Sequence, residues 1–221
     1  MTTASEPKRK RGRPPRAQQV GKSSIITAAL KEFARCGYRG SSIDAIARSA
    51  GVAKALVYYH FGSKEALWRA SVSEAFDTLK DEASRFSGDL EHGDRAVAIE
   101  RFAGSIVKFS SKNPWLVRIA LDETRQGGER AQWLKRNYLL PLQRMLVPII
   151  DRIFGTGQAP RHFAAHLIPT VFGAINFAFI DDDVIAEAHR VDVHSEVYIA
   201  QQAELIAVIL RAMIDQYAGE A

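Results

Sequence analysis

Polar side chains that can bind phosphate groups or base edges gather in one short stretch of the chain. Lys54 supplies a positive charge, Tyr58 and Tyr59 supply hydroxyl donors, and His60 adds an imidazole. Cationic and hydroxyl side chains on one helix are the groups that reach the phosphates and grooves of nucleic acids. The stretch is therefore a candidate nucleic-acid-binding surface, provided that the fold holds these side chains on one exposed face.

Three short helices would position this stretch. Apolar residues recur at helical spacing from Lys22 until a stop signal at Gly37, and Ser42 is a good N-cap for a second helix that ends at Gly51. A third helix is predicted over about 54–60. Two helices joined by a tight glycine-containing turn predict a helix-turn-helix at 42–61, in which the second of the pair enters the major groove.

Small apolar residues support this packing. Ala47 and Ala50 would let the second helix approach the third, and Phe61 with Leu56 or Val57 would anchor the inner side of the third. Ser63 is placed to cap a long helix that follows, so the boundary between this small domain and the rest falls within a helix. We expect no flexible linker there.

Charge is unevenly distributed along the 221 residues. The first 69 residues hold 14 basic and 4 acidic residues, a net charge of +10, whereas the other 152 hold 16 basic and 21 acidic residues, a net charge of −5. A basic front on an acidic body is typical of a nucleic-acid-binding module attached to a separate domain. The alternative is a basic tail that only aids solubility.

The segment "IITAALKEFARCGYRGSSIDAIARSAGVAKALVYYHFGSKEAL" resembles the DNA-binding domain of the tetracycline-repressor (TetR) family, over about 22–67. The landmarks are "AALKEFARCGY", "IDAIARSAGV", "YYHF" and "SKEAL". The resemblance implies that Ser42 caps the second helix and donates to a phosphate, and that Tyr58 and Lys64 contact the DNA backbone. The full set of DNA-contacting positions that it implies is Ser42, Ala53, Lys54, Ala55, Leu56, Tyr58, Tyr59, His60 and Lys64.

The recognition positions depart from the family pattern. Ala53, Ala55 and Leu56 stand where the family often has Ser, Gly and Thr, which removes hydroxyl groups from the turn and from the groove surface. Leu56 could instead contact a thymine methyl group. For Tyr58 and His60, packing between the third and fourth helices is the alternative to phosphate contact.

Residues 1–20 form a basic tail that we expect to be disordered in isolation, because it has few apolar side chains to bury. Its "KRKRGRPPR" run contains the Arg-Gly-Arg-Pro core of an AT-hook, in which Arg11 and Arg13 would follow the floor of an A·T-rich minor groove. The alternative is a nonspecific attraction between the tail and phosphates.

The remaining residues, 68–221, are also helical by periodicity, and no alternating strand pattern is present. Candidate helices run over about 94–112, 114–125, 128–154, 160–188 and 194–217, with kinks or breaks expected at Pro141, Pro148 and Pro169. The predicted fold is all-α, with about nine helices: a three-helix DNA-binding domain at 21–67, then a larger helical effector-binding and dimerisation domain.

A dimer is expected because one such DNA-binding domain reads only a few base pairs. By resemblance, the last two long helices would form a four-helix bundle with their partners, although the same apolar residues could be internal core. The predicted interface residues are Leu167, Val171, Ile175, Phe179, Leu205, Ile209 and Met213.

The resemblance also implies a small-molecule pocket in the larger domain. Its expected lining combines aromatic surface with a few polar groups. The candidates are Trp115, Arg118, Trp133, Tyr138, Phe172, Asn176 and Phe177, each of which could equally be ordinary core.

The sequence contains no motif for a disulfide framework, a metal site or a secretory signal. The single cysteine, Cys36, excludes a disulfide framework, and His162 with His166 offers too few ligands for a metal, so we expect no metal or cofactor. The basic start has no signal-peptide pattern, and the apolar run 167–180 is interrupted by proline and glycine, so a cytoplasmic protein is expected.

The sequence therefore predicts a DNA-binding regulator, not an enzyme. The family default is a repressor that leaves a palindromic operator when a small molecule binds. Two alternatives stay open: an architectural protein of A·T-rich DNA without an effector, and a helical small-molecule carrier or enzyme with an incidental basic tail.

Overall fold

The computed structural model describes residues 16–154 and 163–218, and within them the chain consists of helices joined by short turns and loops, without strands. The predicted all-α class is confirmed. Most of the helices are α-helices, and one short segment is a π-helix, η1. Their bounds are α1 Arg16–Gly40, α2 Ile43–Ser49, α3 Lys54–Phe61, α4 Lys64–His92, α5 Arg95–Lys112, α6 Pro114–Gln126, α7 Gly128–Leu134, η1 Lys135–Leu139, α8 Leu140–Phe154, α9 Phe163–Ile180, α10 Asp182–His189 and α11 Glu196–Ala218.

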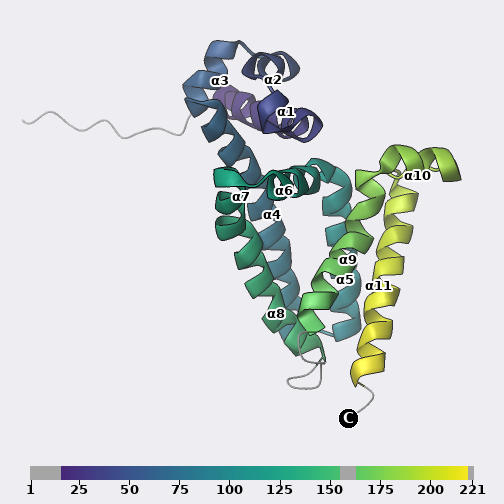
Figure 1. Ribbon diagram of the computed structural model, residues 1–221. Coiled ribbons are helices and arrows are strands. Elements are labelled where there is room, and N and C mark those ends of the chain that lie inside the picture. Colours follow the sequence, from purple (N-terminus) through teal and green to yellow (C-terminus); the bar gives the residue numbers. More distant parts are fainter. Residues whose placement is uncertain (1–15, 155–162, 219–221) are drawn as a thin grey trace, which may run out of the picture.

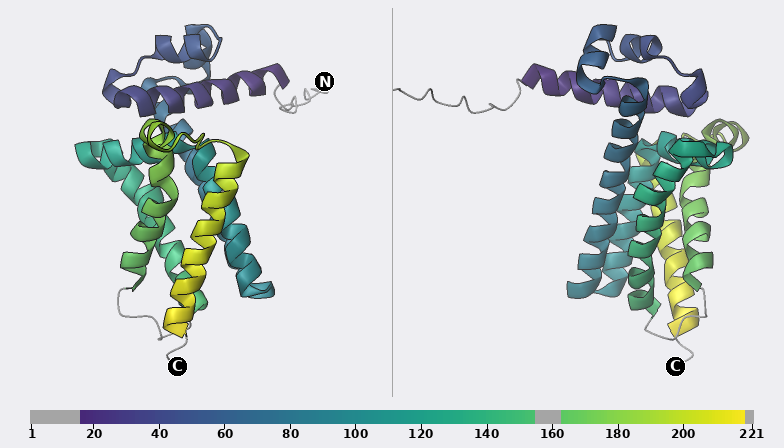
Figure 2. Two further views of the ribbon diagram at one scale, coloured as in Figure 1. Left: turned by 90° about the vertical axis from the view of Figure 1, so that its right-hand side faces the viewer. Right: turned by 60° about the vertical axis from the view of Figure 1, so that its left-hand side comes forward.

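The helices form a small head and a larger body. The head consists of α1, α2, α3 and the start of α4, and it lies at one end of the molecule (Figure 1). The 29-residue helix α4 continues from the head into the body without a break. In the body, α4, α5, α8, α9 and α11 run roughly along one direction, while α6 and α7 lie beneath the head (Figure 2).

The head has a continuous apolar core. Ile25 and Phe33 of α1, Ile46 of α2, Val57 of α3 and Trp68 of α4 are each at most 2% exposed. The same core includes Leu116 and Ile119 of α6 and Leu134 and Tyr138 of the segment that follows. Because α6 contributes to the core of the head, the head is packed onto the body and not merely tethered to it.

Side-chain caps fix where the helices begin. The Oγ of Ser42 accepts a hydrogen bond from the amide of Ala45 at 3.1 Å, and the Oγ of Ser63 accepts one from the amide of Ala66 at 3.0 Å. Both predicted N-caps are confirmed. The turn between α2 and α3 is made by Gly51, whose φ of 67° lies in the left-handed region that favours glycine.

Replacing Ser42 by alanine is expected to lower the free energy of unfolding by about 1 kcal/mol, because an amide at the start of α2 loses its acceptor. Chemical denaturation measures the change. Ser23→Ala is the matched control, since Ser23 is exposed inside α1, where alanine favours the helix. Equal stability of the Ser42 variant and the parent chain would contradict the capping role.

Two predicted helices are each divided. The segment 128–154 is interrupted by η1, where the amide of Leu140 bonds to the carbonyl of Lys135. The next residue, Pro141, has no N–H to offer the carbonyl of Asn137, so a shift to the wider π spacing just before it is favoured. The predicted helix 160–188 breaks at Asp181 into α9 and α10.

Prolines have less effect elsewhere than expected. Pro148 and Pro169 lie inside α8 and α9 without splitting them. As a result, α9 is a continuous 18-residue apolar helix, and the expectation that its apolar run is interrupted was wrong. By length and composition alone, α9 and residues 196–216 of α11 could each cross a membrane, but core helices of soluble proteins meet the same criteria. Within the protomer, 28% and 17% of the two spans are buried.

Candidate nucleic-acid interface and ligand cavity

Helix α3 presents most of its polar side chains to solvent. Tyr59 is 72% exposed and Tyr58 is 45% exposed, whereas Val57 on the opposite side is 1% exposed. Val57 is therefore the inner anchor of the helix. Leu56 is half-buried and lies against Gly21 of α1, so only part of its side chain remains available for a base methyl group.

The beginning of α3 is held by an ion pair with α2. The Nζ of Lys54 lies 2.9 Å from a carboxylate oxygen of Asp44, and this hydrogen bond raises the pKa of Lys54. Both side chains are exposed, so the pair is weak and the lysine can exchange its carboxylate for a phosphate. Ala53 occupies the N-cap without a side-chain hydrogen bond, and Ala55 is exposed.

His60 is turned toward its neighbours. Its ring packs edge-on against Tyr59 and Phe61, with centroids 5.2 and 6.1 Å apart. Its Nε2 is buried, with no hydrogen-bond partner among the described residues. This arrangement fits the packing alternative better than phosphate contact through Nε2.

Lys64 is engaged within the head. Its Nζ donates to the carbonyl of Ser41 at 2.5 Å and lies 4.7 Å from the centre of the Tyr38 ring. Burial and the nearby Arg130 lower its pKa. To contact DNA, the half-buried Lys64 ammonium would have to divide its N–H donors between the Ser41 carbonyl and a phosphate. The DNA contact of Lys64 stays a prediction.

A buried ionic cluster joins the head to the body. The Nε of Arg130 on α7 donates to both carboxylate oxygens of Glu123 on α6, at 3.0 and 3.1 Å. Its guanidinium also lies 3.8 Å from the centre of the Tyr38 ring of α1, and 3.8 Å from a carboxylate oxygen of Glu65 on α4. The Glu123 side chain is 3% exposed. No sequence pattern indicated this cluster.

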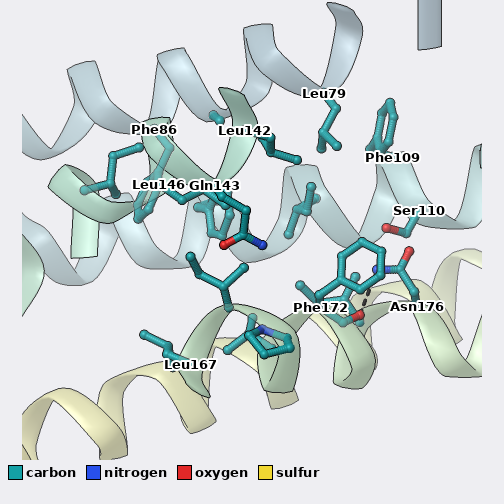
Figure 3. A pocket seen from close by; sticks show the side chains of 18 of the residues that line it. Leu79, Phe86, Phe109, Ser110, Leu142, Gln143, Leu146, Leu167, Phe172 and Asn176 are labelled. Carbon is teal, nitrogen blue, oxygen red and sulfur yellow. Dashed lines mark hydrogen bonds between the residues drawn. The ribbon is translucent and has the colours of Figure 1, made fainter. Parts of the chain in front are cut away.

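The body encloses an elongated cavity of about 350 Å³ between α4, α5, α6, α8, α9 and α11. Figure 3 shows Phe86, Leu146 and Leu167 toward one end, and Ser110, Asn176 and Phe172 toward the other. Of the predicted pocket residues, Phe172 and Asn176 line it. The Nδ2 of Asn176 donates to the carbonyl of Phe172 at 2.8 Å.

The other predicted pocket residues lie outside this lining. Trp115, Trp133 and Tyr138 pack against the core of the head instead. Arg118 donates to the carbonyl of Ile180 and pairs with Asp182, and Phe177 is 62% exposed. Apart from Phe172, the aromatic side chains that line the cavity come from α4 and α5, namely Phe76, Phe86, Phe102 and Phe109, and none of these four was predicted from the sequence.

The predicted dimer surface needs a correction. Leu167, Ile175 and Phe179 are 5%, 3% and 1% exposed, because they pack in the core of their own bundle. Val171 and Met213 are partly buried against that core, and Ile209 is also partly buried. Leu205 is exposed. The apolar side chains that α9 and α11 do leave exposed are Phe172, Phe177, Val197, Leu205 and Val208.

Three of the residues singled out from the sequence, Arg11, Arg13 and His162, lie outside the described residues. Within the described ranges, no three His, Cys, Asp or Glu side chains are grouped as metal ligands. Of the acidic run at 181–183, Asp182 pairs with Arg118 and His194. Burial opposes the charge on Asp182, but the His194 hydrogen bond and Arg118 outweigh it and lower its pKa.

Residues 25–70 match the family model described as bacterial regulatory proteins, tetR family. Over these residues the chain is similar to the DNA-binding domain of the tetR family. The match coincides with the head and the exposed helix α3. The family resemblance seen in the sequence is therefore confirmed, and the chain is similar to regulators whose DNA-binding domain has this helix-turn-helix.

Relatives extend the comparison. The chain is similar to IcaR, the biofilm operon icaADBC HTH-type negative transcriptional regulator of Staphylococcus aureus, with 42% identity over 60 residues, 27% of this chain and 32% of IcaR. The chain thus matches about a third of that relative's length. The HTH-type transcriptional repressor NicS of Pseudomonas putida is 28% identical over 65% of this chain and 67% of NicS.

Solved structures share the whole fold. A TetR-like transcriptional regulator from a Rhodococcus species superposes with a TM-score of 0.63 and 18% identity, covering 91% of this chain and 98% of that one. A transcriptional regulator from Aquifex aeolicus gives a TM-score of 0.58 at 19% identity, with coverage of 87% and 99%. At these identities the likeness concerns the fold, a helix-turn-helix head on a helical body.

Proposed function

We propose that this protein is a cytoplasmic, sequence-specific DNA-binding regulator of the tetR family that represses transcription and is released from its operator by a small molecule. The observation that carries the proposal is α3, which exposes Lys54, Tyr58 and Tyr59 in the domain matched by the family model. These groups can contact phosphates and base edges when α3 lies in the major groove.

A homodimer would supply two such helices for a palindromic site. Its supporting observation is the apolar surface on α9 and α11, where Phe177, Val197, Leu205 and Val208 are 47% to 68% exposed in the protomer. Several exposed apolar side chains on two neighbouring helices favour an interface. Pairing of α9 and α11 with their symmetry mates would cover it.

The cavity can couple ligand binding to DNA binding, because α6 both lines the cavity and packs in the core of the head. Leu116, Val117 and Ala120 of α6 line the cavity, and Leu116 also belongs to the core of the head. A ligand that binds better when α6 is displaced would shift the population toward heads with a different orientation. The Arg130 cluster, which joins α6 and α7 to α1, would transmit the displacement.

Selection of genomic DNA fragments by the purified protein tests the proposal. We expect a small set of recovered fragments that share an inverted repeat. Recovery of fragments at random would contradict sequence-specific regulation. Recovery of A·T-rich fragments without a shared repeat would favour an architectural role for the basic tail.

Replacing Lys54 by alanine should weaken binding to a recovered fragment about tenfold and lower the salt dependence of binding, because one phosphate or base contact is lost. Fluorescence anisotropy at several salt concentrations measures both effects. Lys80→Ala is the matched control, since Lys80 is exposed on α4 in the body. Equal losses in both variants would mean that α3 has no special contact with DNA.

A further inference from the structure

Among the described residues, those that line the cavity of the body offer hydrogen-bonding groups but no charged side chain. Of the described residues that line it, none is acidic, basic or histidine, and the polar ones are Ser110, Gln143 and Asn176. The remainder is aliphatic, aromatic or proline. This lining favours a mostly apolar ligand with few polar groups.

Two of the polar groups form one polar end. Ser110 and Asn176 are 4% and 6% exposed, and Figure 3 places their side chains beside each other, on α5 and α9. The Ser110 hydroxyl has no hydrogen-bond partner among the described residues. Asn176 uses one amide hydrogen on the Phe172 carbonyl and keeps its oxygen and second hydrogen. Both residues line the cavity, so these remaining donors and acceptors are available to a ligand.

The opposite end is apolar. Phe86 and Leu167 are buried there, and the cavity follows α5 from Ile99 to Ser110, a helical rise of about 16 Å. Gln143, Pro169 and Phe172 are the exposed lining residues, so they flank an opening between α8 and α9. Figure 3 shows the Gln143 side chain pointing into the space between the two ends.

A charged head group would be poorly accommodated. A carboxylate or phosphate that enters this cavity loses its hydration and meets no cation among the described lining residues. Burial of an unpaired ion is strongly unfavourable. A hydroxyl or carbonyl group would instead pair with Ser110 and Asn176. We infer that the cavity takes an elongated, apolar and uncharged molecule, whose single hydroxyl or carbonyl head lies between Ser110 and Asn176.

This inference rests on the proposed effector-binding role, but its test needs no DNA. Titration calorimetry with the full-length protein, at about pH 8 where carboxylic acids are ionised, compares 1-decanol, methyl decanoate and decanoate. We expect both uncharged probes to bind and decanoate to bind at least about tenfold more weakly. Decanoate binding as tightly as 1-decanol, or no binding of either uncharged probe, would overturn the inference.

Variants locate the probe and its head group. Ser110→Ala should weaken 1-decanol binding about fivefold through the lost hydrogen bond. Ser105→Ala, on the same helix but outside the lining, should leave it unchanged. Gln143→Lys brings a cation to the exposed side of the cavity and should reduce the preference against decanoate about tenfold. An unchanged preference, or equal effects of the two serine variants, would contradict the assigned head-group position.

Leu146→Trp keeps the inference testable if the serine effects are small. Leu146 is half-buried, so the larger ring can fill the cavity while the helical signal in circular dichroism is retained. Binding of 1-decanol should then be lost, and unchanged binding would place the probe elsewhere. Release of DNA by 1-decanol is measured separately: binding without release would contradict the proposed effector function and leave the ligand class standing.

Discussion

Leu205→Glu combined with Val208→Glu is expected to convert the protein from dimer to monomer and to weaken operator binding about 100-fold or more. Both side chains are on the exposed side of α11, 52% and 47% exposed, so the charges are tolerated in the protomer. In the proposed dimer they would be buried facing their symmetry mates. Loss of the second head removes the gain in effective concentration that two linked half-sites provide.

Light scattering coupled to gel filtration measures the mass, and anisotropy with a recovered fragment measures the affinity. The matched control is Val97→Glu with Val147→Glu, which adds the same charge at exposed valines of α5 and α8, 44% and 39% exposed. The control should remain dimeric. A parent chain that is monomeric when it binds DNA, or a Leu205/Val208 variant that stays dimeric, would contradict the assigned interface.

Glu123→Gln is expected to lower the free energy of unfolding by about 3 kcal/mol. Glu123 is 3% exposed and accepts both bonds from the Arg130 Nε, so its loss leaves a guanidinium without its best partner at 19% exposure. Glu65, at 3.8 Å from Arg130, compensates only in part. Because the cluster joins the head to α6 and α7, DNA affinity should also fall.

Urea denaturation measures this loss. Asp77→Asn is the matched control, since it removes the carboxylate of an exposed pair with Lys80 at 3.5 Å, and such pairs contribute at most about 1 kcal/mol. Similar stability changes in the two variants would show that the Arg130 cluster does not hold the head to the body.

The head was predictable because its determinants are local. Ser42 and Ser63 cap the helices that follow them, and Gly51 takes the left-handed conformation that the turn requires. The apolar spacing on α1 gives a single buried face. Each of these features depends on residues within a few positions of one another, and a family pattern covers the same segment.

The body was less predictable because its helices are apolar on more than one side. In α9, Ile175 faces the core while Phe177, two positions on, is exposed, and the composition alone does not tell which apolar face meets a partner. The ligand cavity follows from how α4, α5 and α9 pack together. The aromatic residues chosen from the sequence therefore fell mostly in the core of the head.

The Arg130 cluster was not predictable for a similar reason. Glu123 and Arg130 are seven positions apart, and they meet because the chain turns between α6 and α7 at Gly127 and Gly128, whose φ angles are 72° and 87°. The aromatic face of Tyr38 comes from the distant helix α1. A sequence pattern does not tell how α6 and α7 are oriented across this turn, nor that α1 packs against them.

A nuclease footprint on a recovered fragment tests the central claim most directly, namely that two copies of α3 read a palindromic site. The predicted result is two protected half-sites, related by an inverted repeat and separated by about one helical turn or a multiple of it. Protection should be lost with the Leu205/Val208 variant at the same protein concentration. A single protected patch, or protection spread evenly over A·T-rich DNA, would contradict the account.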